Sequence, residues 1–572
     1  MFQVYFENEK KTVQVPAGTT VLEAEIRAGL TPDAPCGGQG TCKKCQVSVN
    51  GQLLRACQTR IQGDIKVKTP QSGAPRAHSI LTEGLSRPLA FQPSLHVREV
   101  FLEKALPGEK QSDYERLLHG LFLSGGPLPQ RIRPNLSLAS SLYGLLAKSR
   151  RLYVVHTEDE ILELSLEEPH VYFAAFDIGT TTVVAYLLDG QDGRQIAVES
   201  CLNPQSQYGA DVIMRSHYAL EHGTEALSSC IRQAADQLLA RLAKKAGISV
   251  RDICQVSIAG NTCMHHLFLG LSPASLVHAP YTPAFRESLT LMASDYGLNL
   301  HPSAQLLMLP NIAGYVGADT CGCLMALRPD HKEDITLLLD IGTNGEMVLG
   351  NKDRLVTCST AAGPAFEGAK IQCGMRGSSG AVDHVTFQDG AWEYTTVDHQ
   401  PALGLCGSGL IDLVAQLLLH GFLDESGHLS SGQEDPSVFY LVPPGQAGCP
   451  QGVYITQKDI REVQLAKAAI AAGITLLMEE LSITEEEISC LYIAGAFGNY
   501  MDPASAGAIG MFPKGLADKV QPVGNAAGEG AKIALLNHLE FSDANELAKS
   551  MDFMELATSP SFQDCFVDHL EF

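Results

Sequence analysis

The chain has 572 residues, of which 45% are hydrophobic and 18% are charged, and its formal net charge is -23 at pH 7. This length and composition predict a globular protein of several domains, and the negative charge argues against a nucleic-acid partner, which needs a basic surface. No apolar run reaches the roughly 18 residues of a membrane span, and no basic segment followed by an apolar core opens the chain. We therefore expect a cytoplasmic protein without a membrane partner.

Residues 1–73 begin with the pattern of a small mixed domain. Apolar and polar residues alternate over 2–6, which predicts a strand with one buried face, and 12–15 is a second predicted strand. Threonines ahead of an amphipathic stretch that ends at Gly29 predict a capped helix.

Four cysteines follow this helix with gaps of five, two and eleven residues: Cys36, Cys42, Cys45 and Cys57. Four thiolates on and after a glycine-rich loop can ligate the two irons of a [2Fe–2S] cluster. A structural zinc site is the alternative, because Cys42 and Cys45 have the spacing of a zinc knuckle. The order of strand, strand, helix and cysteine loop resembles the plant- and adrenodoxin-type ferredoxins, which have a β-grasp fold. This resemblance favours a [2Fe–2S] cluster over zinc. The gap before Cys57 is shorter than in those electron carriers.

The next two segments carry no motif to which we assign chemistry. Residues 74–107 contain four prolines and no sustained period, which predicts an extended or partly helical linker. Residues 108–168 regain helical patterning, and we expect a small middle domain of helices plus a strand.

Two copies of one motif organise the chain from residue 169 onward. Residues 171–188 and 335–350 each run from an apolar strand through Asp-Ile-Gly-Thr and a tight turn into a second apolar run, which predicts two hairpins. Glycine lets the backbone approach a ligand closely, and the hydroxyl and N–H groups of such turns suit phosphate oxygens. The predicted phosphate-binding residues are Gly179, Thr180, Thr181, Thr182, Gly342, Thr343, Asn344, Gly345 and Glu346. Asp177 and Asp340 are hard oxygen ligands suited to Mg²⁺.

A third motif occurs at 491–500, LYIAGAFGNY, where an apolar strand leads into Gly495, Ala496, Phe497 and Gly498. The order of these three motifs resembles the actin, sugar-kinase and Hsp70 (ASKHA) superfamily of ATPases. The two connecting-helix motifs of that superfamily are matched more loosely, at 311–320 and 524–532. The resemblance implies a duplicated, ribonuclease H-like α/β domain over 169–572, with lobes at about 169–332 and 333–572, that binds ATP and Mg²⁺.

Two further polar residues are catalytic candidates. Asn261 follows an apolar strand at the position where an α/β sheet places ligand contacts. Glu367 follows a Gly-Pro turn beyond the second phosphate loop, where it would contact Mg²⁺ through water or orient the attacking water. The alternative for Glu367 is an ordinary surface carboxylate, since exposed glutamate is common.

A one-electron cluster and an ATPase in one chain favour electron transfer to an acceptor whose potential lies below that of the donor. The blocks NPQSQYGADVIMRS, LLLDIGTNGE, GPAFEGAKI and YIAGAFGNYM resemble the reductive activators of corrinoid proteins. This resemblance implies ATP-dependent reduction of a protein-bound Co(II) corrinoid to Co(I) for methyl transfer. It also implies a corrinoid protein of a methyltransferase system as partner, a separate electron donor, and a homodimer.

Two other functions remain open from the sequence. One is an ATP-driven electron donor similar to the activators of 2-hydroxyacyl-CoA dehydratases, which carry a [4Fe–4S] cluster and lack a ferredoxin domain. The other is a non-catalytic protein in which ATP and redox state gate the binding of a partner.

Overall fold

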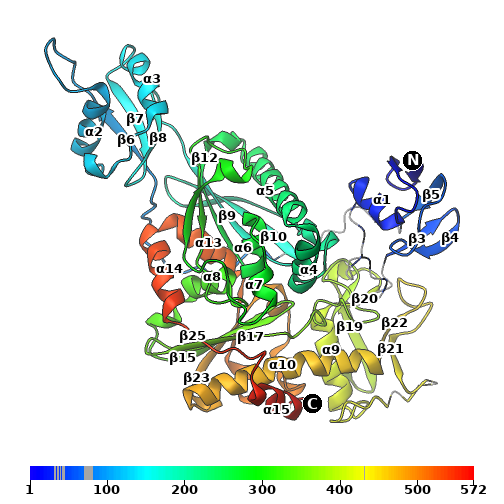
Figure 1. Cartoon of the computed structure of the whole chain (residues 1–572). Helices are drawn as coiled ribbons and strands as arrows, with labels where there is room; N and C mark the ends of the chain where they lie inside the picture. The colour runs from blue at the N-terminus through cyan, green and yellow to red at the C-terminus, as the bar shows by residue number, and fades with distance from the viewer. Residues whose placement is uncertain are drawn as a thin grey trace.

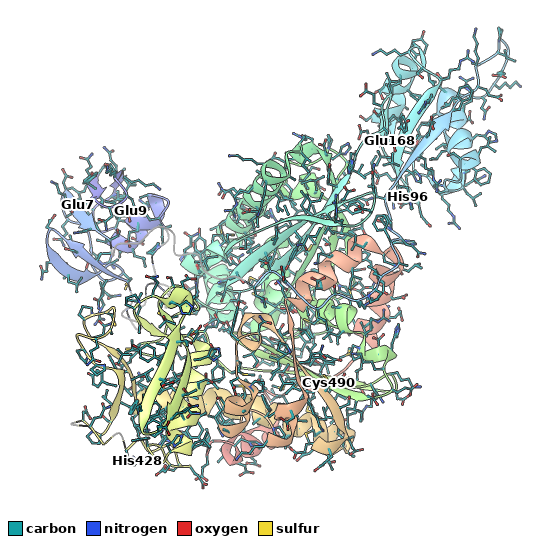
Figure 2. All side chains as sticks on the ribbon, turned by 180° about the vertical axis from the view of Figure 1, so that it is seen from behind. Glu7, Glu9, His96, Glu168, His428 and Cys490 are labelled. Atoms are coloured by element: carbon teal, nitrogen blue, oxygen red, sulfur yellow. The ribbon has the colours of Figure 1, made fainter. Side chains whose placement is uncertain are left out.

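The computed structural model describes residues 1–30, 45–69, 81–430 and 435–572, together with positions 32, 34, 38, 40, 432 and 433. Two predicted cluster ligands, Cys36 and Cys42, lie outside the described residues. Figures 1 and 2 show two small domains on opposite sides of a large two-lobed body. Within the described parts of the chain, no helix combines the length and the apolar character needed to cross a membrane.

The N-terminal domain is a mixed sheet with one helix packed on it. Its elements are β1 (Phe2–Phe6), β2 (Lys11–Val15), α1 (Val21–Arg27), β3 (Gln46–Val49), β4 (Gln52–Arg55) and β5 (Ile65–Lys68). The strand order is β2-β1-β5-β3-β4, and the central strands β1 and β5 are parallel. Thr20 and Glu23 form a capping box at the start of α1. The predicted strands, the helix and the β-grasp arrangement are confirmed.

The second small domain is an antiparallel sheet covered by two helices. Its elements are β6 (His96–Phe101), α2 (Asp113–Leu123), α3 (Leu136–Leu146), β7 (Arg151–His156) and β8 (Ile161–Ser165), and the sheet order is β6-β7-β8. The structure differs here from the prediction, because β6 falls inside the expected linker 74–107 and the domain has three strands where one was expected. β6 pairs with β7, which lies far later in the chain, so its short sequence carries no local signal of its partner.

The first lobe of the large body contains one six-stranded sheet in the order β11-β10-β9-β12-β14-β13. Its strands are β9 (Tyr172–Ile178), β10 (Thr182–Asp189), β11 (Gln195–Leu202), β12 (Ile253–Gly260), β13 (Leu289–Met292) and β14 (Gln305–Met308). Its helices are α4 (Val212–His222), α5 (Glu225–Ala246), α6 (Thr262–Leu269), α7 (Ala274–Val277) and α8 (Ala318–Leu327).

The second lobe repeats this plan in the sheet β24-β23-β15-β16-β17-β25. Its strands are β15 (Ile335–Ile341), β16 (Gly345–Gly350), β17 (Leu355–Thr360), β23 (Ile488–Ala494), β24 (Val520–Gly524) and β25 (Asp552–Phe553). In both lobes three antiparallel strands are followed by two parallel ones, β9-β10-β11 with β12 and β14, and β15-β16-β17 with β23 and β24. The predicted duplication is therefore confirmed.

The second lobe also carries a smaller subdomain and several helices. Its remaining strands are β18 (Ala381–Gln388), β19 (Ala391–Thr396), β20 (Gly404–Leu405), β21 (Val438–Val442) and β22 (Val453–Thr456). Its helices are α9 (Gly407–Leu419), α10 (Gln457–Leu481), α11 (Gly495–Gly498), α12 (Pro503–Ala508), α13 (Ala526–Leu536), α14 (His538–Ser550) and α15 (Pro560–Asp568).

Helices α8 and α13 connect the two lobes. They cross so closely that a Cβ atom on Gly530 would lie 2.2 Å from the carbonyl oxygen of Gly322. Side chains of both sheets, such as Phe173 in β9 and Leu338 in β15, belong to one buried cluster with these helices. This shared core fixes the two hairpins opposite each other.

Candidate functional site

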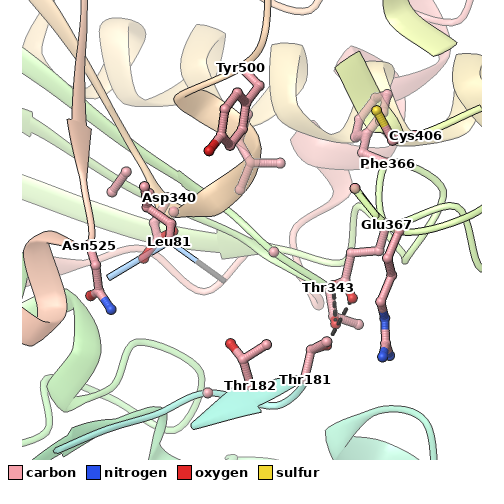
Figure 3. Close-up of a pocket in the computed structure, with 18 of the residues that line it drawn as sticks. Leu81, Thr181, Thr182, Asp340, Thr343, Phe366, Glu367, Cys406, Tyr500 and Asn525 are labelled. Atoms are coloured by element: carbon pink, nitrogen blue, oxygen red, sulfur yellow. Dashed lines mark hydrogen bonds between the residues drawn. The ribbon is translucent and has the colours of Figure 1, made fainter. Parts of the chain in front are cut away.

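The two predicted hairpins face one cavity between the lobes (Figure 3), and its volume is about 550 Å³. A cavity of this size lies within the range of about 300–1,000 Å³ that is typical of small-molecule sites. The predicted site residues that line it are Asp177, Gly179, Thr180, Thr181, Thr182, Asn261, Asp340, Gly342, Thr343, Asn344, Glu346, Glu367 and Gly495. The structure thus brings together residues from both copies of the motif.

Glu367 bridges the two turns. Thr181 Oγ1 and Thr343 Oγ1 each donate a hydrogen bond to its carboxylate, both at 2.8 Å (Figure 3). Phosphate oxygens are acceptors of the same kind, so a phosphate group placed here would compete with Glu367 for both hydroxyls. The carboxylate is therefore a polar link across the cleft and not an ordinary surface group.

The backbone of the first turn is held from behind by two buried side chains. Arg215 Nη2 donates to the Thr180 carbonyl at 2.6 Å, and Asn203 Nδ2 donates to the Gly179 carbonyl at 2.8 Å. Both side chains are fully buried, and burial lowers the pKa of Arg215 to about 10. Within the described chain Arg215 has no ion-pair partner, so its donors are committed largely to backbone carbonyls and other neutral acceptors. This arrangement fixes the shape of the turn.

Three partly buried carboxyl groups in the cavity lining lie close enough to repel one another: Asp177, Asp319 and Asp340. Burial raises the pKa of Asp177 and of Asp340 to about 7, and repulsion from neighbouring carboxylates adds to the shift. Burial also raises the pKa of Asp319 to about 6. Asn525 Nδ2 donates to the Asp177 carboxylate at 2.9 Å, which partly offsets its desolvation. A cation placed here would favour the ionised state of all three groups.

The glycines of the motifs have different roles. Gly495, the first residue of α11, has a φ of +84°, and a Cβ on it would lie 3.0 Å from Asp340 Oδ1, so the close approach of the backbone to that carboxylate favours glycine. Gly498 packs against Ile493 instead, and Gly345 faces Thr360. The side chains of Ala496 and Phe497 are outside the described part of the structure.

Asn261 lies at the junction of β12 and α6. Its Nδ2 donates to Thr180 Oγ1 at 3.0 Å, and its Oδ1 accepts a hydrogen bond from Met264 N at 3.0 Å, which caps α6. Asn261 therefore positions a hydroxyl of the first turn in addition to lining the cavity.

Sequence analysis did not single out several residues that build this site: Leu81, Asn203, Arg215, Asp319 and Asn525. Asp319 and Asn525 fall within the two looser connecting-helix matches, which was the available signal for them. Asn203 and Arg215 lie in the block NPQSQYGADVIMRS, whose polar residues gave no indication of burial. Leu81 lies in the predicted linker and had no signal.

The cysteine segment is described at Cys45 and Cys57, both of which are buried. Ala56 N donates to the Cys45 carbonyl at 2.7 Å, which holds the two cysteines at the same end of the domain. Gly38 has a left-handed φ of +88°, and a Cβ on it would lie 3.9 Å from Cys57 Cβ. Gln58 Nε2 reinforces this contact by donating to the Gly38 carbonyl at 3.2 Å. Gly38 therefore lies beside Cys57, and the two described cysteines are buried thiols at one end of the domain, where a cluster could be held.

Comparison with known proteins agrees with this architecture. Residues 334–572 match the family model described as the C-terminal domain of RACo, the ASKHA domain, and residues 172–332 match the RACo middle region. The corrinoid activation enzyme RamQ of Eubacterium limosum is 34% identical over 595 residues, covering 99% of this chain and 98% of RamQ. A Co(II) methylated amine-specific corrinoid protein reductase of Methanosarcina barkeri is 25% identical over 435 residues, covering 70% of this chain and 77% of the reductase. The solved structure of a reductive activator for corrinoid, iron-sulfur protein is similar with a TM-score of 0.77 and 31% identity, covering 100% of this chain and 98% of that one.

The duplicated lobes, with one phosphate-type turn each and two crossing helices, define an ASKHA-type protein that carries a ferredoxin-like domain. The chain belongs to the family of reductive activators of corrinoid proteins. The resemblance and the fold class predicted from the motifs are both confirmed. The match to the RACo middle region covers the first lobe and not the small domain expected at 108–168.

Proposed function

We propose that this protein uses ATP hydrolysis to drive the reduction of a Co(II) corrinoid on a partner protein to Co(I). The partner is a corrinoid protein of a methyltransferase system, and a separate electron donor supplies the electron. The names of the two relatives support this proposal, since one is a corrinoid activation enzyme and the other a Co(II) corrinoid protein reductase. We further propose that the protein acts as a homodimer.

The observation that carries the ATP-binding proposal is the pair of turns linked through Glu367. Hydroxyls from both lobes converge on one carboxylate, so both lobes can hold one polyphosphate between them. Binding of ATP would replace the Glu367 carboxylate at one or both hydroxyls. Freed from this link, Glu367 can accept a hydrogen bond from the attacking water, which is the role of a water-orienting residue.

The carboxyl groups of Asp177 and Asp340 suit a Mg²⁺ ion bound with the nucleotide. Among the described residues, no three His, Cys, Asp or Glu side chains are arranged to hold a metal by themselves. Mg²⁺ keeps several of its waters and is bound through one or two carboxylates plus phosphate oxygens. The two aspartates therefore fit as ligands, directly or through water, once ATP supplies the phosphate.

The ferredoxin-like domain would hold a [2Fe–2S] cluster on Cys36, Cys42, Cys45 and Cys57. When bound, such a cluster supplies a one-electron carrier. Among the described residues, the chain's own contribution is the burial of Cys45 and Cys57 and the close approach of Gly38 to Cys57. This domain also argues against a dehydratase activator, a type of protein that lacks it.

Free energy explains why ATP hydrolysis and electron transfer would occur in one chain. For one electron, a potential difference of about 300 mV corresponds to about 7 kcal/mol. Hydrolysis of ATP is a free-energy source of that magnitude, so it can drive an electron to an acceptor of lower potential than the donor.

The decisive experiment is a corrinoid reduction assay with anaerobically purified protein. A Co(II) corrinoid protein is mixed with this protein and a reductant too weak to reduce cobalt alone, and the Co(I) absorbance is followed with and without Mg-ATP. We expect Co(I) to form with Mg-ATP and not with a non-hydrolysable analogue. A trace that stays flat across a panel of corrinoid proteins, despite ATP turnover, would refute the proposed reduction.

A further inference from the structure

The segment that enters the two-lobed body from the ferredoxin-like domain forms part of the nucleotide cavity. Leu81 lines this cavity together with Asn525 (Figure 3). Next to it, the Glu83 carbonyl accepts a hydrogen bond from Asn525 N, and Leu85 N donates to the Val523 carbonyl, both at 2.9 Å. The segment thus adds to the sheet beside β24, where that strand passes into α13.

Two glycines make this backbone contact possible. A Cβ on Gly84 would lie 2.5 Å from the carbonyl oxygen of Asn525, and a Cβ on Gly524 would lie 2.2 Å from the carbonyl oxygen of Glu83. Gly524 also has a left-handed φ of +64°. The contact is a built feature, because a side chain at either position would force the two backbones apart.

The segment stays attached along residues 81–92, which we call the entry strap. Arg87 forms an ion pair with Glu540 at 2.8 Å, with side chains that are 25% and 16% exposed. Further on, Gln92 N donates to the Leu536 carbonyl at 2.8 Å, and His538 N donates to the Gln92 carbonyl at 3.0 Å. The entry strap is therefore fixed to α13 and α14 and does not behave as a free linker.

Asn525 connects the entry strap to the first lobe. Its backbone N–H is bonded to Glu83, while its side-chain amide donates to the Asp177 carboxylate at 2.9 Å. Any ligand that changes the position or charge of Asp177 acts on the residue that anchors the strap. The strap in turn is the point at which the chain of the ferredoxin-like domain reaches the nucleotide cavity.

We propose that the entry strap is part of the nucleotide site: Leu81 contacts the bound nucleotide, and occupancy of the site further restrains a strap that is already hydrogen-bonded to Val523 and Asn525. Nucleotide binding would then determine the position of the entry strap, to which the ferredoxin-like domain is tethered. This inference rests on the proposed function, since it requires that the cavity binds ATP.

A matched pair of variants tests the contact. Leu81→Ala removes an apolar side chain from the cavity, whereas Leu465→Ala removes the same group from α10, at a position that is 45% exposed and outside the cavity lining. We expect Leu81→Ala to raise the KM for ATP about fivefold, as for loss of part of a leucine's apolar contact, with an unchanged cluster spectrum. Leu465→Ala should leave the KM within about twofold, because exposed substitutions have small effects. Equal KM values in the two variants would overturn the contact.

Hydrogen–deuterium exchange of the full-length protein tests the coupling. With Mg-ATP we expect exchange in the entry strap to slow about tenfold, because a nucleotide that contacts Leu81 and Asp177 would restrain the strap at Leu81 and at Asn525, next to the hydrogen bond from the Leu85 amide to Val523. Unchanged exchange, with saturating Mg-ATP bound, would overturn the coupling even if the KM result held. Failure of the proposed function is distinguishable, because it would show as wild-type protein that binds no ATP or forms no Co(I).

Discussion

Glu367 accepts hydrogen bonds from Thr181 and Thr343, one residue from each turn. Among the described residues, no other side chain accepts a hydrogen bond from both turns. Because a carboxylate and a phosphate compete for these donors, Glu367 would lose these hydrogen bonds when the proposed ATP binds. Its position between the loops suits the orientation of water once the phosphate has taken over the hydroxyls.

Replacing Glu367 with glutamine should therefore reduce ATP turnover while leaving the fold intact. We expect kcat for ATP hydrolysis to fall by about 100-fold, at the lower end of the range for positioned acid–base groups, with a smaller change in KM. Steady-state ATPase assays measure both constants. Glu333→Gln is the control, because that side chain is 79% exposed and its pair with Lys352 lies at the surface. A Glu367→Gln variant as active as Glu333→Gln would remove Glu367 from the mechanism.

The environment of Glu25 in α1 predicts how the stability of the N-terminal domain depends on pH. Its side chain is buried, and burial, followed by repulsion from Glu9, raises its pKa from 4.5 to about 8. In the folded domain the Glu25 carboxyl group keeps a proton that the unfolded chain loses above about pH 4.5. The free energy of unfolding of the domain therefore falls as the pH rises from about 4.5 through about 8. Between pH 6 and pH 8 we expect a loss of up to about 2 kcal/mol. Thermal unfolding of the ferredoxin-like domain at the two pH values measures it.

Glu25→Gln should abolish this pH dependence and make the domain more stable at pH 8 than the wild type. Glu7→Gln, a substitution at an exposed position of the same domain, should retain the wild-type dependence. If Glu25→Gln and the wild type lose the same stability between the two pH values, the buried carboxyl group is not the cause.

At the scale of elements, the crossing of α8 and α13 determines how the two lobes meet. Gly530 and Gly322 let the helix backbones approach, and the cluster around them contains side chains from both sheets. A side chain at this crossing would spread the helices and displace the turns that the sheets present to the cavity. Loss of stability and loss of nucleotide affinity should therefore occur together.

Gly530→Ala should destabilise the two-lobed body by about 1–3 kcal/mol, the usual cost of overpacking a core. The added Cβ would lie 2.2 Å from the Gly322 carbonyl oxygen. This oxygen belongs to the backbone, which shifts less readily than the end of a flexible side chain. Chemical denaturation followed by circular dichroism measures the change. Gly144→Ala in α3 is the control, because its Cβ would meet no atom within 4 Å and alanine favours a helix. Equal stabilities would show that the crossing tolerates a wider separation.

The elements that sequence analysis predicted are those with a local pattern. The hairpins at Asp177 and Asp340 combine apolar runs with a turn motif, and α1 has its cap in the adjacent residues. β6 and the entry strap could not be predicted, because each is defined by a partner far away in the chain, β7 for the former and Gly524 for the latter. The site follows the same division: the turn residues were evident, whereas Arg215 acts through burial that its sequence does not show.

The whole molecule holds its two proposed activities in separate bodies. Cys45 and Cys57 lie in the core of the N-terminal domain, whereas Asp340 lines the cavity of the two-lobed body. The two bodies have separate hydrophobic cores. Each centre should therefore survive the loss of the other, even though the proposed corrinoid reduction requires both.

Two variants of the full-length protein separate the centres. Cys57→Ala should abolish the visible spectrum of the cluster and the formation of Co(I), yet retain ATP binding, because no side chain of the cavity changes. Asp340→Ala should lower ATP turnover at least 100-fold through loss of the proposed Mg²⁺ ligand and leave the cluster spectrum unchanged. Absorbance spectroscopy, nucleotide titration and the corrinoid assay on both variants measure this double dissociation. If Cys57→Ala also lost ATP binding, the domains would be interdependent in folding; if Asp340→Ala formed Co(I) at the wild-type rate, ATP would not be held between the two turns.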